Sequence, residues 1–329
     1  AGNQDGWLDP GEAAALEIPV INTVSSTFLS VSLKVSNDNP EITFFQEELA
    51  YGYIGVGDTV SRTYYVILSY DVPQNFLSTF NTLITAPINI VVPGSFEIDI
   101  GKKDVLIADF EENDISSDVL ENRLQLLDYD YDRMTFFPEE LKKYKSVFVC
   151  LGVRNAGQQL SIAQGEQLAE YLDRSGKLYL EGGDAWFFDP ETAVRPYFGI
   201  QGLDDGDNSL TKAFGRQGTI TESMDFDYNG ERISIDRIGA FGNAQVIFDN
   251  VSPSYGVAVS KDGGYYRTIG SSFEFGGLTD NIFPSTKDEL LLRYLDFFQV
   301  RRLEVEARFF AEDPFICLGE SVTFNNYST

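Results

Sequence analysis

The sequence predicts a multidomain, β-rich chain with an α/β domain at its centre. Up to residue 101, short runs rich in Val, Ile, Phe, Tyr and Thr alternate with turn residues, which is typical of an antiparallel β-sandwich. From about residue 102, strand and helix patterns alternate, which indicates a parallel sheet. From Leu303, strand patterns return in a stretch too short to bury a core by itself. We therefore expect a sandwich at 1–101, an α/β domain at 102–301 and an incomplete β module at 302–329.

The expected strands of the first domain are separated by turn-forming sequences. Apolar residues occupy every second position of Leu29–Val35, so this strand buries one face and exposes the other. Breakers such as Ser36–Pro40 and Gly55–Asp58 separate such runs. The expected strands are 16–21, 29–35, 42–45, 60–68 and 88–100.

The second domain opens with Val105–Phe110, a nearly all-apolar run expected for a strand buried on both faces. Ser117 is a candidate cap for a helix whose leucines recur at three- and four-residue steps. The pattern Ser161-x-x-Gln164 predicts a capping box at the next helix. Further strands are expected at 131–137, 146–151 and 177–180, so the order indicates parallel strands joined by right-handed crossovers.

Residues 218–275 are again β-rich and predict an insertion or an antiparallel extension of the α/β domain. Turn pairs such as Asn229-Gly230 and Asp262-Gly263 favour hairpins. The expected strands are 219–221, 232–235, 245–248, 256–259 and 265–269. A closing helix is expected from the capping pattern Thr286-x-x-Glu289.

Composition excludes several classes of function. The 24 Lys and Arg against 51 Asp and Glu give a net charge of −27, which repels nucleic acid and anionic membrane surfaces. The chain contains no His, which excludes Ser-His-Asp and Cys-His catalysis and His-ligated zinc. Its two Cys form neither a disulfide framework nor a CxxC metal site. The sequence contains no run of about 18 apolar residues, the length that a membrane-spanning helix needs.

The first twelve residues fit the grammar of a calcium-binding loop except at Ala1. Gly6 permits the sharp turn of such a loop. The oxygen ligands would come from Asn3, Asp5, Trp7 (main chain), Asp9 and Glu12. The run resembles the NxDGxLDPGE opening of CARDB or immunoglobulin-like (Ig-like) β-sandwich modules in secreted bacterial proteins, and Ile18–Thr23 matches the sequence that follows it. Bound Ca²⁺ is expected; an acidic turn without an ion is the alternative.

The central domain resembles noncatalytic members of the class I glutamine amidotransferase-like family, which have a flavodoxin-type fold. The resemblance rests on Tyr144–Gly152, on 160–176 and on Lys177–Asp184. Active members carry a Cys on a G-x-C-x-G elbow and a later His and Glu. Here Cys150 lies within an apolar strand, where a buried, inert thiol is expected. The resemblance therefore implies the fold without the reaction, and no residue is assigned a catalytic role.

The final stretch, 307–329, resembles the first third of a PKD-type Ig-like module. It carries the family's Cys, Gly, Ser-Val and Phe positions at Cys317, Gly319, Ser321-Val322 and Phe324. Cys317 could form a disulfide with a cysteine that lies outside this sequence.

Three aspartates are expected to form a ligand cluster at the carboxyl ends of the parallel strands: Asp109, Asp184 and Asp189. They could bind a cation or sugar hydroxyls, or they could be solvated loop ends. The Asp-rich run Leu203–Asn208 could hold a second Ca²⁺ or be an ordinary polar loop. Trp186–Phe188 could stack on a sugar ring or pack over the sheet edge.

These features favour a noncatalytic structural and interaction segment of a large secreted or cell-surface bacterial protein, adhesin- or filament-like and calcium-stabilised. The resemblances imply export by the type IX pathway, an extracellular or cell-surface location and, as partners, other domains of the same polypeptide or a surface glycan or protein. The chain reads as a mature or excised piece of a longer polypeptide. The alternative is an accessory substrate- or glycan-binding part of a secreted peptidase or glycan-acting enzyme. An independent hydrolase would need a carboxylate-only or metal mechanism.

Overall fold

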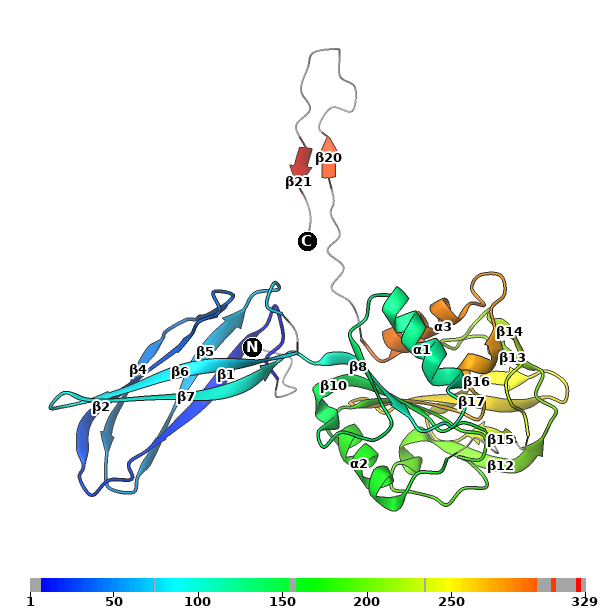
Figure 1. Ribbon diagram of the computed structural model, residues 1–329, viewed down its shortest axis with the longest axis horizontal. Helices are drawn as coiled ribbons and strands as arrows, with labels where there is room; N and C mark the ends of the chain where they lie inside the picture. Colours follow the sequence, from blue (N-terminus) through cyan, green and yellow to red (C-terminus); the bar gives the residue numbers. More distant parts are fainter. Residues whose placement is uncertain are drawn as a thin grey trace, which may run out of the picture.

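The computed structural model describes residues 7–73, 75–153, 158–233 and 235–300, and the backbone of the short strands 309–311 and 324–326. Strands, arranged in several separate sheets, dominate this described part, which contains three α-helices (Figure 1). The expectation of a β-rich chain built from several units is confirmed at this level. None of the described helices is both long enough and apolar enough to span a membrane.

The first unit is a sandwich of two antiparallel sheets, ordered β1-β5-β3 and β4-β2-β6-β7. Its strands are β1 (Ala13–Ile21), β2 (Phe28–Asn37), β3 (Ile42–Phe44), β4 (Glu48–Ile54), β5 (Thr59–Leu68), β6 (Phe76–Ala86) and β7 (Ile90–Ile100). Buried side chains of both sheets, such as Val35, Val66 and Phe80, form one core. Tyr64 of β5 also donates a hydrogen bond to the Leu33 carbonyl of β2 at 2.6 Å. Strands β4 and β6 were not expected from the sequence.

The second unit is built on a twelve-stranded sheet. Five neighbouring strands, in the order β9-β8-β10-β11-β18, are parallel. They are β8 (Lys103–Asp109), β9 (Tyr131–Met134), β10 (Tyr144–Cys150), β11 (Lys177–Glu181) and β18 (Arg267–Ser271). The remaining strands extend this sheet in antiparallel pairs: β12 (Ile200–Asp207), β13 (Lys212–Gly215), β14 (Asp225–Tyr228), β15 (Ile235–Ala240), β16 (Ala244–Asn250), β17 (Tyr255–Asp262) and β19 (Leu278–Thr279). The β-rich stretch is therefore an extension of the main sheet.

Helices cover both faces of the parallel strands. The buried leucines of α1 (Ile115–Leu126) and α3 (Lys287–Phe297) belong to one core, and those of α2 (Ile162–Asp173) belong to the core on the opposite face. The capping box of α2 is present, and Thr286 caps α3 through the Glu289 N–H. The expectation for Ser117 is wrong: it lies inside α1, whose N-cap is Asp114, and a carboxylate described below binds the N–H groups of the first turn.

Two short antiparallel strands follow, β20 (Phe309–Ala311) and β21 (Phe324–Asn326). The rest of the expected third module, including Cys317, lies outside the described residues.

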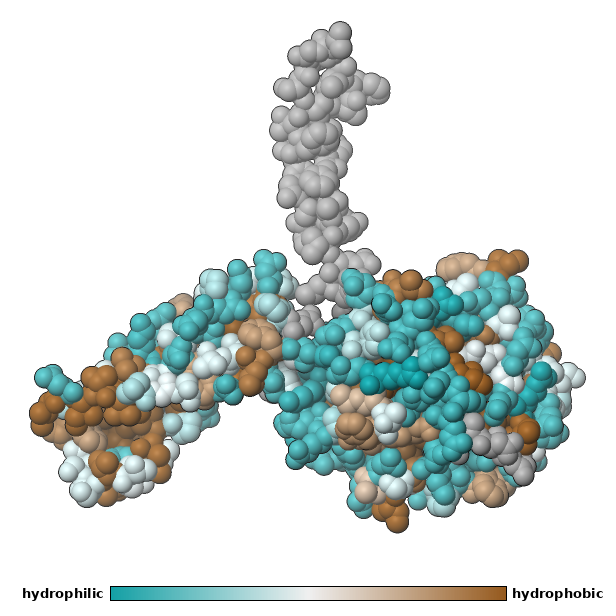
Figure 2. All heavy atoms as spheres, viewed as in Figure 1, coloured by the Kyte–Doolittle hydropathy of each residue, from teal (hydrophilic) through white to brown (hydrophobic). Residues whose placement is uncertain are grey.

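Apolar side chains gather at the end of the sandwich furthest from the α/β unit, whereas the visible face of that unit is largely hydrophilic (Figure 2). Ile88, in the turn between β6 and β7, is 95% exposed, and Leu29 is 75% exposed. The sequence from Phe76 to Phe96 carries no charged residue, although the chain as a whole is strongly acidic.

Candidate functional site

The parallel strands end in a row of buried side chains. Cys150 is in register with Asp109 of β8 and Glu181 of β11, and Glu181 is in register with Ser271 of β18. The preceding residues on the same side of these strands pack in the core beneath α1 and α3, so the row lies at the carboxyl edge of that face. Open α/β sheets bind their ligands at this edge, so the row is a candidate functional site.

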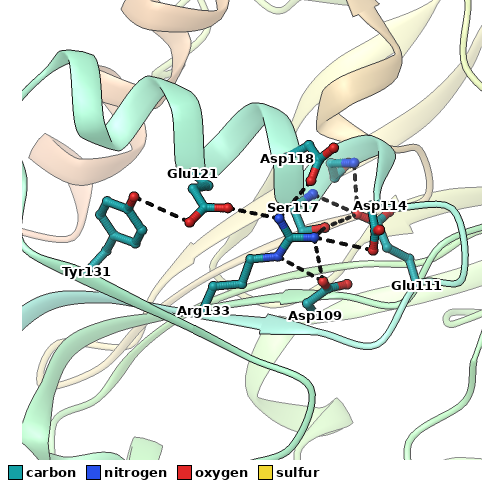
Figure 3. A network of polar contacts seen from close by, with 9 residues as sticks. Asp109, Glu111, Asp114, Ser117, Asp118, Glu121, Tyr131 and Arg133 are labelled. Atoms are coloured by element: carbon teal, nitrogen blue, oxygen red, sulfur yellow. Dashed lines mark hydrogen bonds and ion pairs between the residues drawn. The ribbon is translucent and has the colours of Figure 1, made fainter.

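Asp109 is held in an ion-pair network centred on Arg133 of β9 (Figure 3). The guanidinium group lies 2.8 Å from the Asp109 carboxylate, which is 5% exposed. It also pairs with three carboxylates around α1: Asp114, Asp118 and Glu121. Burial lowers the pKa of Arg133, but hydrogen bonds to these carboxylates outweigh it, so the net shift is upward. The side chain of Asp109 therefore ties β8 to β9.

Glu111 caps helix α1. Its Oε1 accepts the backbone N–H groups of Ser116 at 2.8 Å and Ser117 at 2.6 Å, and the Ser117 hydroxyl at 2.8 Å. A carboxylate at this position satisfies N–H groups that have no partner within the helix, and it complements the helix dipole. Burial raises the pKa of Glu111, and these hydrogen bonds only partly offset the rise.

Glu181 and Glu274 complete what we call the strand-end cluster, formed by Asp109, Glu111, Glu181 and Glu274. The Glu181 Oε2 accepts the Tyr179 hydroxyl at 2.6 Å and the Phe275 N–H at 2.7 Å. Glu274 accepts the Glu231 N–H at 3.2 Å. Burial, together with the charge of Glu111, raises the pKa of Glu181 to about 8 and that of Glu274 to about 7. Both carboxyls act as acceptors that hold neighbouring loops in place.

Cys150 lies in the middle of this row and is buried, as the sequence predicts. Burial and then the charges of Glu181, Glu111 and Asp109 raise its pKa well above the usual value. A nucleophilic cysteine needs the opposite, a thiolate stabilised by positive charge in an accessible position.

A second acidic group, which we call the aspartate cluster, brings together Asp184, Asp205 and Asp236. One carboxylate oxygen from each lies within 4.8 Å of the other two, so the group could hold a metal ion. Asp184 follows β11, Asp205 lies on β12 and Asp236 lies on β15. Asp236 is buried, while the other two are partly exposed. Burial comes first among the causes that raise the pKa of Asp236 to about 7, and the charges of Asp184 and Asp205 add to it.

The structure therefore distributes the three expected aspartates over different environments. Asp109 belongs to the strand-end cluster and Asp184 to the aspartate cluster. Asp189 is a neighbour of Asp184, because its N–H donates to the Asp184 carbonyl at 2.8 Å. Burial and then the charge of Asp184 raise the pKa of Asp189 to about 6, although Arg195 lowers it.

The aromatic run beside Asp184 is divided between core and surface. Trp186 is buried, and its indole N–H donates to the Ser271 carbonyl at 2.8 Å. Phe187 and Phe188 are exposed. One side chain thus packs over the sheet edge, and two are accessible to a ligand.

Part of the expected calcium loop is described. Asn3 and Asp5 lie outside the described residues. The Asp9 N–H donates to Glu12 Oε2 at 3.0 Å, so the loop folds back on itself, and the ring of Trp7 lies 5.3 Å from the Lys102 ammonium.

Sequence reasoning missed Asp236 and the three glutamates. Glu181 is the last residue of the buried strand β11, and Glu111 follows the buried strand β8 by two residues, so their positions were an available signal. Asp236 carried no such signal, because its place in the cluster depends on where β15 lies beside a loop fifty residues earlier in the chain.

No protein family model and no curated protein matches the chain. Among solved structures, an exo-β-1,4-mannosidase from Opitutaceae bacterium strain TAV5 is 10% identical with a TM-score of 0.40, over 53% of this chain and 32% of the mannosidase. The periplasmic chaperone SfaE is 10% identical with a TM-score of 0.21, over 29% of this chain and 52% of the chaperone. A 2,6-sialyltransferase from Photobacterium sp. JT-ISH-224 is 10% identical with a TM-score of 0.21, over 57% of this chain and 36% of that enzyme. The chain spans about a third of the two enzymes and about half of the chaperone, and likenesses this weak support no statement about activity.

Proposed function

We propose that this chain is a noncatalytic structural and interaction segment of a large secreted or cell-surface bacterial protein, stabilised by calcium. In this proposal, the sandwich is Ig-like, and the α/β unit is a flavodoxin-type, amidotransferase-like domain without activity. The last residues begin a PKD-type module, and the parent protein leaves the cell by the type IX pathway.

The observation that carries the proposal is the use of the strand-end cluster. Asp109 binds Arg133, Glu111 caps α1, and Glu181 holds the Tyr179 hydroxyl and the Phe275 N–H. At the edge where related architectures bind ligands, these side chains connect elements of the fold. A catalytic carboxylate or thiol must instead face substrate.

The apolar end of the sandwich supports the interaction part of the proposal. Exposed aliphatic side chains such as Leu29 and Ile88 lie in uncharged sequence, and exposed apolar patches are typical of contact surfaces. Another domain of the same polypeptide is the partner that the proposal favours.

Calcium is the cation we propose for the N-terminal loop, where Asn3, Asp5, Trp7, Asp9 and Glu12 would supply oxygen ligands. Oxygen-only donor sets suit hard cations such as Ca²⁺.

The proposal is tested by assaying the purified chain against ester, amide and glycoside substrates with and without Ca²⁺. No turnover is expected. Turnover that Glu181→Gln abolishes while the circular dichroism spectrum is unchanged would contradict the proposal, because it would give this carboxyl a chemical role.

One observation favours an accessory glycan-binding role as a second candidate: Phe187 and Phe188 are exposed beside Asp184 and Asp189. Aromatic faces next to carboxylates are typical partners for sugar rings and their hydroxyls. A glycan array would detect binding that both Phe188→Ala and Asp184→Ala abolish; an array without such binding eliminates this role.

A further inference from the structure

The aspartate cluster joins three separate parts of the α/β unit. Asp184 lies on the loop after the parallel strand β11, and Asp205 and Asp236 lie on the paired antiparallel strands β12 and β15. Their carboxylate oxygens lie within 4.8 Å of one another. Three carboxylates at this separation repel one another strongly unless a proton or a cation lies between them.

Asp236 provides an independent sign that something binds here. Its side chain is buried, and its Oδ2 accepts the N–H groups of Trp186 and Phe187, both at 2.8 Å. Its Oδ1 is buried with no hydrogen-bond partner among the described residues. A buried acceptor without a partner is destabilising, and natural proteins rarely keep one without a ligand or water.

The same two strands also show how the chain neutralises carboxylates elsewhere. Asp204 and Asp207 flank Asp205 and pair with Arg237, at 4.0 and 3.1 Å. The register of β12 against β15 shifts between Asp204 and Asp207, where Gly206 adopts a positive φ of 68°. At this β-bulge, Asp204 and Asp207 pair with Arg237, whereas the Asp205 carboxylate lies beside those of Asp184 and Asp236.

The donor set selects the class of cation. All three ligands are carboxylate oxygens, the chain has no His, and Cys150 lies beside Asp109 and Glu181 of the other cluster, so soft and borderline metals lack their preferred ligands here. Ca²⁺ takes about six to eight oxygen ligands in flexible geometry, whereas Mg²⁺ demands a near-ideal octahedron. Asp184 and Asp205 are partly exposed, so water can enter and complete a large, irregular shell.

We propose that Asp184, Asp205 and Asp236 bind one Ca²⁺ ion that fastens the β12–β15 pair to the loop after β11. The site is separate from the N-terminal loop, and it rests on the proposed function only for the choice of calcium. Because Asp236 also binds the N–H groups of Trp186 and Phe187, the ion would stiffen the loop that presents the exposed Phe187 and Phe188.

Terbium luminescence can test this site by itself. The chain has two Trp, Trp7 in the N-terminal loop and Trp186 beside the aspartate cluster. In Trp7→Phe protein, Tb³⁺ emission excited through Trp reports on Trp186. We expect emission that Ca²⁺ suppresses by competition and that equimolar Mg²⁺ leaves largely intact.

The matched pair of variants is Asp205→Asn and Asp204→Asn, both in the Trp7→Phe background. The first removes a ligand, and the second removes a neighbouring charge that pairs with Arg237. We expect at least a tenfold loss of Tb³⁺ and Ca²⁺ affinity in Asp205→Asn and less than a twofold change in Asp204→Asn. Equal losses in both variants, or the absence of Trp-sensitised emission, would overturn the proposal; displacement by Mg²⁺ as readily as by Ca²⁺ would overturn the choice of calcium.

Melting temperatures measured in chelator distinguish the loss of a calcium ligand from a defect in folding. Relief of carboxylate repulsion should leave Asp205→Asn at least as stable as the parent without Ca²⁺, while the calcium-dependent rise in the melting temperature of the α/β unit disappears. A variant that melts lower in chelator and still gains the full rise with Ca²⁺ would assign Asp205 a merely structural role and overturn the site. None of these results depends on whether the chain is catalytic, so failure here leaves the proposed function standing.

Discussion

The two acidic clusters of the α/β unit lie in the same domain but are stabilised in different ways. In the strand-end cluster, Arg133 and the first turn of α1 supply positive charge and N–H donors to Asp109 and Glu111. In the aspartate cluster, two backbone N–H groups serve one oxygen of Asp236, and the facing oxygens are all from carboxylates.

Access also differs between the two clusters. All four members of the strand-end cluster are buried, so a cation would have to lose its whole hydration shell to enter. Asp184 and Asp205 are partly exposed. The comparison shows that a group of acidic side chains indicates a function only when two further properties are known. These are the hydrogen-bond donors and positive charges around the carboxylates, and the access of solvent to them.

The largest effect is expected from Arg133→Met. This change removes the only described ion pair of Asp109, a member of the strand-end cluster. The free energy of unfolding should fall by about 3 kcal/mol, because Asp109 stays buried without its counterion. Urea denaturation followed by Trp fluorescence measures the loss. Arg174→Met is the control, since the Arg174–Glu170 pair is exposed and should contribute at most about 0.5 kcal/mol. Equal losses would remove the distinction between a structural network and surface charge.

Removing the cap from α1 should have the next largest effect. Glu111→Ala leaves the N–H groups of Ser116 and Ser117 without their acceptor, at a loss of about 2 kcal/mol. Glu111→Gln keeps an acceptor oxygen and should lose less than half as much in the same urea titration. A larger loss in the Gln variant would mean that the carboxylate charge matters more than the acceptor.

Glu181→Gln should change how stability depends on pH. The folded pKa of Glu181 is about 8, above its unfolded value, so the folded state keeps a proton that the unfolded state loses. The contribution of Glu181 to the free energy of unfolding is fully present below the unfolded pKa. It declines by up to about 1.4 kcal/mol per pH unit as the pH rises toward 8. The Gln variant should flatten unfolding free energies measured between pH 5 and 8. An unchanged slope would show that Glu181 is ionised in the folded protein.

The smallest effect is expected at the aspartate cluster. Ca²⁺ at about five times its dissociation constant should stabilise this site by about 1 kcal/mol, since a ligand that binds only the folded state shifts the equilibrium by mass action. Asp236→Asn should abolish that contribution in thermal melts of Trp7→Phe protein, whereas Glu111→Gln should retain it. Retention of the full calcium effect in Asp236→Asn would contradict the different roles given to the two clusters.

Local patterns predicted the elements that local interactions determine. The Ser161–Gln164 capping box forms as expected, and the apolar run Val105–Phe110 coincides with most of the buried strand β8. Ser117 was misassigned because its residue type favours a cap, whereas Glu111, three residues before the N-cap, binds the N–H groups instead. Strands β4 and β6 were missed; in β6, Ser, Asn and Thr interrupt the apolar pattern.

The candidate sites show the same division. Asp184 and the Asp-rich run containing Asp205 were each singled out, but as parts of separate sites. Their contact with each other and with Asp236 depends on the register of β12 against β15 and on the bulge at Gly206. Register over such separations is set by tertiary packing, which single-sequence patterns do not contain.

The most direct test of this account is an anomalous difference map from crystals of the chain grown with Ca²⁺ and, in parallel, with Tb³⁺. We predict a peak among Asp184, Asp205 and Asp236, with oxygen ligands at about 2.3–2.6 Å for Ca²⁺, and none among Glu111, Glu181 and Glu274. A metal peak at the glutamates, or a peak in the N-terminal loop together with none at the three aspartates, would contradict it.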